Sequence, residues 1–107
     1  MTEPTYAFYP NLAAEAAIPA RGIHSQTLSS EGGVDLVLFA LAAGEQLSEH
    51  TAARAAIVHV LSGEGGLTVA GDTHEIGPGA WLRMDPRTPH SIEASTAMVF
   101  ALYLLAG

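Results

Sequence analysis

Glycine and proline divide this chain into short segments from Gly22 onward, and this regular division constrains the fold more than any other feature. Between the dividing residues lie short runs rich in valine, isoleucine, leucine and aromatic residues, while the apolar periodicity of an amphipathic helix is weak throughout. Short strands at regular spacing, separated by turn residues, are typical of an all-β sandwich or barrel. We therefore expect an all-β fold.

The runs expected to form strands are residues 23–29, 34–42, 56–61, 67–70, 74–76, 80–84, 91–94 and 97–105. Hairpin turns are expected at residues 62–66 and at Gly71, because glycine supplies the positive backbone dihedral angles that tight turns require. Pro78 and Gly79 predict a further turn. Around eight strands with short connections favour two antiparallel sheets folded over each other as a jelly roll.

Residues 1–20 differ from the rest because Pro4, Pro10 and Pro19 interrupt them and their one helix-like piece is NLAAEAA. This pattern predicts an extended N-terminal arm with one helical turn, followed by a barrel domain over residues 21–107. A chain of 107 residues suits one domain and is too short for two, since domains most often have about 100 to 150 residues.

Charge and composition limit the kinds of molecule that this chain is expected to bind. With four arginine or lysine residues against eleven acidic ones, the formal net charge is −7, so binding to the phosphates of nucleic acid is not expected. The chain has no cysteine, which excludes disulfides and thiolate chemistry and agrees with a reducing cytoplasm. The N-terminus lacks the pattern of a secretion signal and the longest apolar run is too short to span a bilayer, so we expect a cytoplasmic protein without membrane contact.

Two segments carry histidines between recognisable turns. In GEQLSEHTAARAAIVHVLSG, five residues separate Gly44 from His50, and VLSGEGGLTVAG then follows as strand, turn and strand. In PGAWLRMDPRTPHSI, a Pro-Gly pair, a strand and a proline-containing turn precede His90. Together these segments resemble the two motifs of the cupin family over roughly residues 36–105. The resemblance implies a cupin-type double-stranded β-helix, or jelly-roll, barrel.

The same resemblance implies that His50 and His90 project into one cavity as metal ligands. The family's other two ligand positions hold Ala52 and Ala56 here, so two of the four ligands are kept. First-row transition metals prefer about four to six ligands. A divalent metal (Fe, Zn, Ni or Mn) would therefore need a further protein ligand or several waters, and whether one is bound stays open.

His59 is the candidate for a third metal ligand by residue type, since it lies in the same run as Ala56. Side chains alternate between the two faces of a strand, so if residue 56 points inward, Val58 and Val60 also point inward and His59 points outward unless a bulge intervenes. His24 is another possibility, while His74 follows a tight turn and is expected to be exposed.

Charged residues near His50 have simpler interpretations than catalysis. Glu45 and Glu49 alternate with polar residues, which is typical of a solvated face. Arg54 could bind an anionic ligand through two guanidinium nitrogens, but pairing with a nearby acidic residue is the expected role. No side chain is assigned as catalytic.

Three functional hypotheses follow. The first is a small single-domain cupin, acting as a homodimer, that binds a small molecule in the barrel through His50 and His90, with a divalent metal between them as an open possibility. The second is a metal-dependent enzyme, an oxygenase or isomerase acting on a small organic compound. The third is a non-catalytic sensing or accessory dimer with a vestigial pocket. One fold hosts many activities, so the family alone does not give a reaction.

Overall fold

The structure is a computed structural model that describes residues 5–106. The elements in chain order are η1 (Leu12–Glu15, a 3-10 turn), β1 (Ile23–Ser29), β2 (Val34–Leu41), β3 (Gln46–His50), β4 (Ala56–Ser62), β5 (Gly65–Val69), β6 (Asp72–Ile76), β7 (Trp81–Met84), β8 (His90–Ala94) and β9 (Met98–Leu105). Within the described residues, no helix has the length and apolar character needed to cross a membrane.

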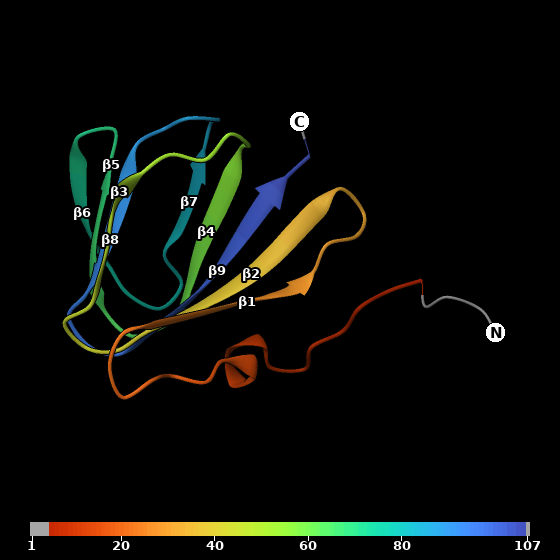
Figure 1. Ribbon diagram of the computed structural model, residues 1–107, viewed down its shortest axis with the longest axis horizontal. Coiled ribbons are helices and arrows are strands. Elements are labelled where there is room, and N and C mark those ends of the chain that lie inside the picture. The colour runs from red at the N-terminus through yellow and green to blue at the C-terminus, as the bar shows by residue number, and fades with distance from the viewer. Residues whose placement is uncertain (1–4, 107) are drawn as a thin grey trace.

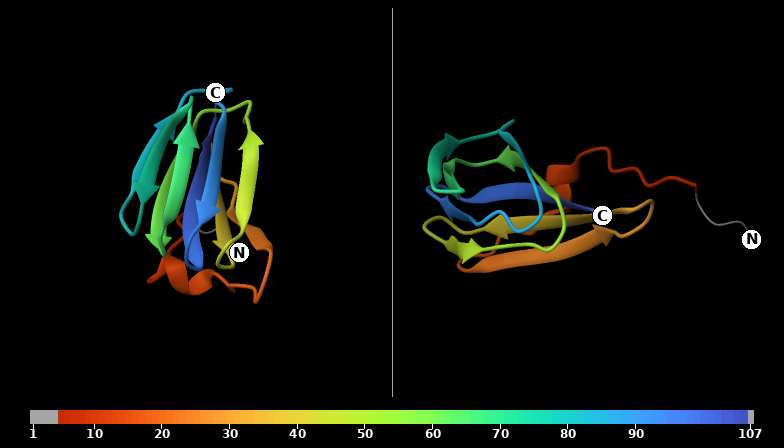
Figure 2. Two further views of the ribbon diagram at one scale, coloured as in Figure 1. Left: turned by 90° about the vertical axis from the view of Figure 1, so that its left-hand side faces the viewer. Right: turned by 90° about the horizontal axis from the view of Figure 1, so that it is seen from above.

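The strands form two antiparallel sheets that face each other (Figure 1). The larger sheet has the order β1-β2-β9-β4-β7, and the smaller has the order β3-β8-β5-β6. Figure 2 shows the two sheets as separate layers that curve around a shared interior. The expected all-β jelly-roll barrel is confirmed.

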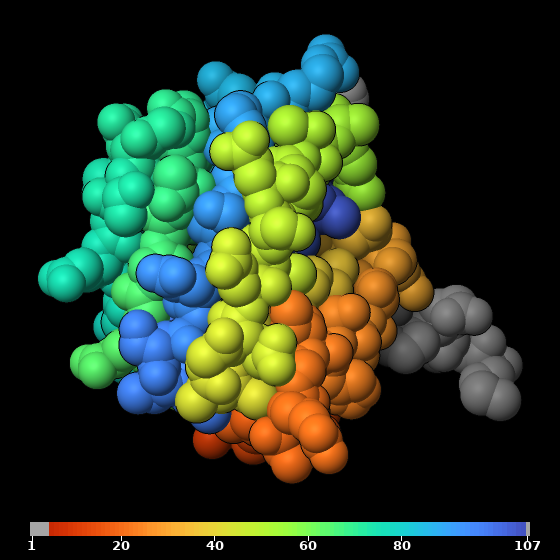
Figure 3. Space-filling view, turned by 60° about the vertical axis from the view of Figure 1, so that its left-hand side comes forward, coloured from red at the N-terminus to blue at the C-terminus, as the bar shows by residue number. Residues whose placement is uncertain are grey.

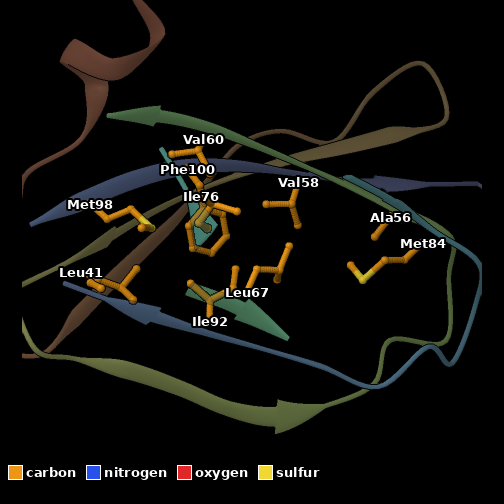
Figure 4. Close-up of a cluster of buried hydrophobic side chains, with 11 residues drawn as sticks. Leu41, Ala56, Val58, Val60, Leu67, Ile76, Met84, Ile92, Met98 and Phe100 are labelled. Atoms are coloured by element: carbon orange, nitrogen blue, oxygen red, sulfur yellow. The ribbon is translucent and has the colours of Figure 1, made fainter. Parts of the chain in front are cut away.

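Alternation of side chains along each strand fills the interior between the two sheets. In β4, Ala56, Val58 and Val60 are all buried, whereas the residues between them are only partly so. These three side chains belong to the main apolar cluster, which has Leu41 and Met98 at one end and Ala56 and Met84 at the other (Figure 4). The sequence-based expectation that residues 56, 58 and 60 share the inward face is therefore correct.

The N-terminal arm covers the outer face of the larger sheet. A second buried cluster lies there, formed by Leu38, Ala40, Val99 and Ala101, and residues of the arm such as Leu12 pack against it. The hydroxyl of Tyr9 also donates a hydrogen bond to the carbonyl of Leu28, at 3.1 Å. The expected helical turn is present as η1, while residues 1–4 of the expected arm lie outside the described residues.

Strand β3 was not among the expected strands. It lies at the edge of the smaller sheet, where it pairs with β8, and this yellow-green segment is at the surface in Figure 3. Four of its residues are exposed, and Leu47 is partly buried. An edge strand with one apolar residue lacks the alternation of apolar and polar residues by which strands are recognised in a sequence. Glu49 and the polar residues beside it, predicted to form a solvated face, are therefore exposed residues of a strand, and Glu45 lies just before that strand.

The turn at Gly63 is tightly packed. Its backbone has φ +83°, a conformation that favours glycine, and a Cβ atom added there would overlap the backbone of Ala97 and Met98. Gly71 in the β5–β6 hairpin has a similar φ of +86°, but a Cβ atom there would meet open space. Both turns were expected from the sequence.

Candidate functional site

His50 and His90 lie directly opposite each other on β3 and β8. Their ring centroids are 4.2 Å apart, with an angle of 57° between the ring planes. The register of the two strands shifts between Leu47 and His50, so His50 reaches this position through an irregularity at the end of its strand. The structure therefore brings together the two histidines that the motifs singled out.

Both rings are held in the same tautomer by the backbone. The Nδ1 atom of His50 lies 2.8 Å from the carbonyl of Ser48, and the Nδ1 atom of His90 lies 2.9 Å from the carbonyl of Thr88. A carbonyl oxygen can only accept, so each Nδ1 must carry the proton and donate it. In the neutral form, each Nε2 then keeps a free lone pair, which is the arrangement of histidines that bind metals or accept hydrogen bonds.

The two rings differ in burial. His90 is 6% exposed and is the one buried polar side chain in the described part of the chain, whereas His50 is exposed. Among residues 5–106, no buried side-chain nitrogen or oxygen lacks a hydrogen-bond partner. The structure gives the Nε2 atom of His90 no such partner, so this atom must reach solvent. The pair, called the mouth below, therefore lies at the adjoining ends of β3 and β8, with His50 exposed and His90 buried.

Apolar residues end the strand that leads to His90 along the chain. Met84 ends β7 and His90 begins β8, so the two residues lie at the two ends of the turn that connects these strands. Ala56 is the cross-strand partner of Met84 and is 1% exposed. Ala56 occupies the position where the family motif has an acidic or amide ligand, so an inward-facing methyl group stands where that ligand would be.

His59 is not brought to the histidine pair. It lies between Val58 and Val60 on β4 and is opposite Trp81 and Ala101, on the outer face of the larger sheet. Within the described residues, no group of three or more histidine, cysteine, aspartate or glutamate side chains is placed to hold a metal ion. Metal ligation by His59 stays a prediction, and it would require the outer face of β4 to turn inward.

The other histidines also lie apart from the pair. His24 is exposed on β1, with its Nδ1 atom 3.3 Å from the carbonyl of Ala17. His74 is exposed on β6, as its place after a tight turn predicts, but its side chain is on the inner face, opposite Leu67. The inward orientation of His74 was not expected from the sequence.

Arg54 has a structural role. Its Nη1 atom lies 2.7 Å from a carboxylate oxygen of Asp35, and its other guanidinium nitrogens donate to the carbonyls of Leu104 and Leu105. The expected pairing with an acidic residue is therefore confirmed. Glu45 likewise accepts a hydrogen bond from the backbone N–H of Gly22 at 3.0 Å, while Glu49 is exposed.

A separate pocket of about 330 Å³ lies between the two sheets and has no counterpart among the expected features. Its lining residues are Val58, Val60, Leu67, His74, Ile76, Ala80, Trp81 and Leu82. Neither His50 nor His90 lines it. The inward apolar residues of β4 were expected, but no sequence signal shows that the facing edges of β6 and β7 leave a space between them.

Comparison with known proteins supports the fold. The family model described as "Cupin domain" matches residues 37–105. A cupin superfamily protein from Desulfitobacterium hafniense is 22% identical with a TM-score of 0.83, and the match covers 91% of this chain and 89% of that one. A Cupin 2 conserved barrel domain protein from Leptotrichia buccalis is 27% identical with a TM-score of 0.80, over 89% and 46% of the two chains.

A more distant match has a described activity. A variant of salicylate 1,2-dioxygenase from Pseudoaminobacter salicylatoxidans is 18% identical with a TM-score of 0.72, and the match covers 88% of this chain and 30% of that one. At this level of identity the match shows a common fold and no more. No curated protein matches the chain.

Proposed function

Since this chain belongs to the cupin domain family, we propose that it binds a small molecule at the mouth of its barrel, with the Nε2 atoms of His50 and His90 as its polar anchors. The observation that carries the proposal is the matched tautomer of the two rings, whose Nδ1 atoms donate to the carbonyls of Ser48 and Thr88. Two imidazole rings held in this way, with centroids 4.2 Å apart, offer two nitrogen lone pairs close to each other.

A divalent metal fits this site in part. The His50 and His90 imidazoles are suitable donors for iron, zinc, nickel or manganese, and the backbone carbonyls behind them supply the outer hydrogen bonds typical of metal-binding histidines. Ala52 and Ala56 offer no donor. When bound, such a metal supplies Lewis acidity toward an oxygen atom of the ligand. The role of the two histidines is to hold the ion by two bonds and leave its other positions to the small molecule or to water.

A metal-dependent enzyme, an oxygenase or isomerase, is the second candidate, and the same observation favours it. Open positions around an ion held by two histidines would let a chelating substrate bind directly, which catalytic metal sites require. Likeness of fold to salicylate 1,2-dioxygenase is compatible with this candidate and does not identify a substrate. The third candidate, a vestigial pocket in a sensing or accessory protein, predicts that neither histidine affects binding.

The first experiment is to measure the metal content of the purified, untagged protein by elemental mass spectrometry. The wild type is compared with the His50→Ala, His90→Ala double variant and with a His24→Ala, His59→Ala control, which removes two histidines from elsewhere. Near-stoichiometric metal that is lost only in the first variant supports the metal-assisted form of the proposal. If incubation with iron, zinc, nickel and manganese loads neither protein, the metal form and the enzyme candidate are rejected, and binding of metal-free ligands remains to be tested.

We also propose that the chain forms a homodimer through its N-terminal arm. Tyr6 and Phe8 are 79% and 73% exposed on an extended segment that leads away from the barrel (Figure 2). Exposed apolar surface that is gathered in one place is a feature of protein interaction sites. A second copy of this chain is the proposed partner, with the Tyr6 and Phe8 side chains of each copy packed against the other.

A further inference from the structure

We propose that the pocket between the edges of β6 and β7 is a second binding site, which takes a small, neutral, planar aromatic molecule that hydrogen-bonds to His74. This site is distinct from the histidine pair at the mouth. β6 is the last strand of the smaller sheet and β7 is the last strand of the larger one, and the two are not hydrogen-bonded to each other. The barrel is therefore open along its side at this place.

The walls of the pocket are apolar and come from both sheets. Val58, Val60 and Leu82 line it from the larger sheet, and Leu67 and Ile76 line it from the smaller sheet. The backbones of packed sheets are about 10 Å apart, so the space left between two layers of side chains is narrow. A slot with branched aliphatic walls favours a flat ring over a bulky or extended ligand.

The size of the pocket sets the size of the ligand. Its volume is about 330 Å³, and a cavity of about 150 Å³ lined by aliphatic and aromatic residues is known to hold one benzene molecule. A pocket of roughly twice that volume, partly open to solvent, suits a bicyclic ring or a substituted benzene. Larger cofactors such as nucleotides do not fit.

His74 provides the polar contact. It is opposite the buried Leu67, so its side chain is on the inner face of β6. Among residues 5–106 its ring nitrogens have no hydrogen-bond partner in the protein, so they are available to a ligand. Asp72 lies two residues before it on the same face of β6, and the chain has a net charge of −7. These negative charges disfavour a carboxylate ligand and favour a neutral group, such as an N–H or a phenol, that donates to the imidazole.

The pocket is separate from the mouth of the barrel. Leu67 lines the pocket, while Val69, the next inward residue of β5, has His90 as its cross-strand partner. The two sites therefore lie at different positions along β5 within the barrel interior. The proposal does not depend on metal binding or on the function proposed for His50 and His90.

Trp81 is a built-in reporter of binding. It is the one tryptophan of the chain and it lies at the rim of the pocket: it is among the lining residues, while its pairing with His59 places its side chain toward the outer face of the larger sheet, 61% exposed. In a two-dimensional ¹H–¹⁵N spectrum of the labelled protein it gives a single indole N–H signal. The probes are unlabelled indole, a bicyclic hydrogen-bond donor, and benzofuran, which has the same shape but no N–H. Comparing their affinities separates the contribution of ring burial from that of the hydrogen bond.

We expect saturable movement of the Trp81 signal with both probes and a preference for indole of about threefold to tenfold, the effect of one neutral hydrogen bond. His74→Ala removes this preference. Ala80→Leu, which fills the pocket, weakens the binding of both probes by at least about tenfold. The matched controls His24→Ala and Ala97→Leu, and the His50→Ala, His90→Ala variant, bind as the wild type does.

Three results would overturn the proposal. The first is no movement of the Trp81 signal or of the backbone amide signals of Val60 and Ile76 at about 5 mM indole, a concentration that reveals even millimolar affinity. The second is equal binding by the Ala80→Leu variant when its spectrum shows a folded protein. The third is loss of binding in the His50→Ala, His90→Ala variant when its spectrum shows a folded protein, which would mean that the probe binds at the histidine pair.

Discussion

Arg54 holds Asp35 at 2.7 Å while it also donates to the carbonyls of Leu104 and Leu105, so one side chain ties the start of β2 to the end of β9. Its side chain and that of Asp35 are 36% and 30% exposed. The exposed pair Arg83 and Asp85 has the same separation of 2.7 Å, with 56% and 77% of the two side chains exposed. Two ion pairs of equal length thus differ in burial and in their additional hydrogen bonds.

The Arg54→Ala variant is therefore expected to lose about 1 to 3 kcal/mol of unfolding free energy, because it removes several charge-assisted hydrogen bonds and leaves two carbonyls to water. Arg83→Ala, the matched control, is expected to change stability by less than about 0.5 kcal/mol, as is usual for exposed pairs. Urea denaturation followed by circular dichroism measures both. Equal effects of the two substitutions would show that Arg54 is no more than a surface residue.

The Gly63→Ala variant tests the packing of the turn between β4 and β5. The positive φ alone costs about 1 to 3 kcal/mol, and the added methyl group must also displace the backbone of Ala97 and Met98. Gly71→Ala has nearly the same φ but an open environment, so it shows the cost of the backbone conformation by itself. Thermal denaturation should place the melting temperature of Gly63→Ala clearly below that of Gly71→Ala, and the opposite order would refute the close approach.

The two histidines at the mouth are expected to differ in their effect on folding. His90→Ala removes a buried ring and its hydrogen bond to the Thr88 carbonyl, which should cost about 1 to 3 kcal/mol. His50→Ala changes an exposed residue and should cost less than about 0.5 kcal/mol. Chemical denaturation in the presence of a chelator measures the protein alone. A large loss for His50→Ala would mean that this ring supports the fold.

The missing ligands can be restored by the Ala52→His, Ala56→Glu double variant. Each added donor should raise zinc affinity by at least about tenfold, since the two histidines and the new side chains then form a four-ligand set. Ala56 is 1% exposed, so the metal-free variant should be less stable than the wild type and should recover stability when zinc is added. Isothermal titration and thermal denaturation measure the two effects.

The matched control for this variant is Ala52→His, Ile57→Glu, in which the carboxylate is moved by one residue to the outer face of β4. It should bind zinc no more tightly than Ala52→His alone. Equal affinity of the two double variants would show that residue 56 does not face the histidine pair.

The proposed dimer predicts that the Tyr6→Ser, Phe8→Ser variant is a monomer when the wild type is a dimer. Sedimentation velocity over a range of concentrations measures the assembly state, and circular dichroism confirms that the barrel still folds. A Thr5→Ser control, in the same segment, should remain a dimer. A wild type that is monomeric at every concentration would reject the arm as a dimer contact.

Rules that depend only on residues close together in the sequence predicted much of this fold. The alternation of faces along a strand placed Ala56, Val58 and Val60 inward and His59 outward, and the glycines at 63 and 71 marked the turns. The resemblance to the cupin motifs predicted that His50 and His90 lie close together. Each of these predictions depends on neighbouring residues or on a known spacing, and both kinds of information are present in one sequence.

Other features depend on contacts between distant segments, so the sequence alone could not show them. The tautomers of His50 and His90 follow from the distances to the carbonyls of Ser48 and Thr88, which depend on backbone geometry. The orientation of His74 depends on the register of β6 against β5. The pocket beside it depends on how far apart two unpaired strand edges lie, and no residue type encodes that separation.

The place of β9 in the larger sheet has a consequence for synthesis of the protein on the ribosome. Residues 98–105 lie between β2 and β4, so strands made early have no central partner until this late segment leaves the exit tunnel. Until then, the edges of β2 and β4 that pair with β9 keep unpaired N–H and C=O groups open to other chains, a condition that favours aggregation of newly made proteins. Rapid release of the finished chain, or protection by a chaperone, should therefore matter more to this protein than to one whose neighbouring strands pair in order.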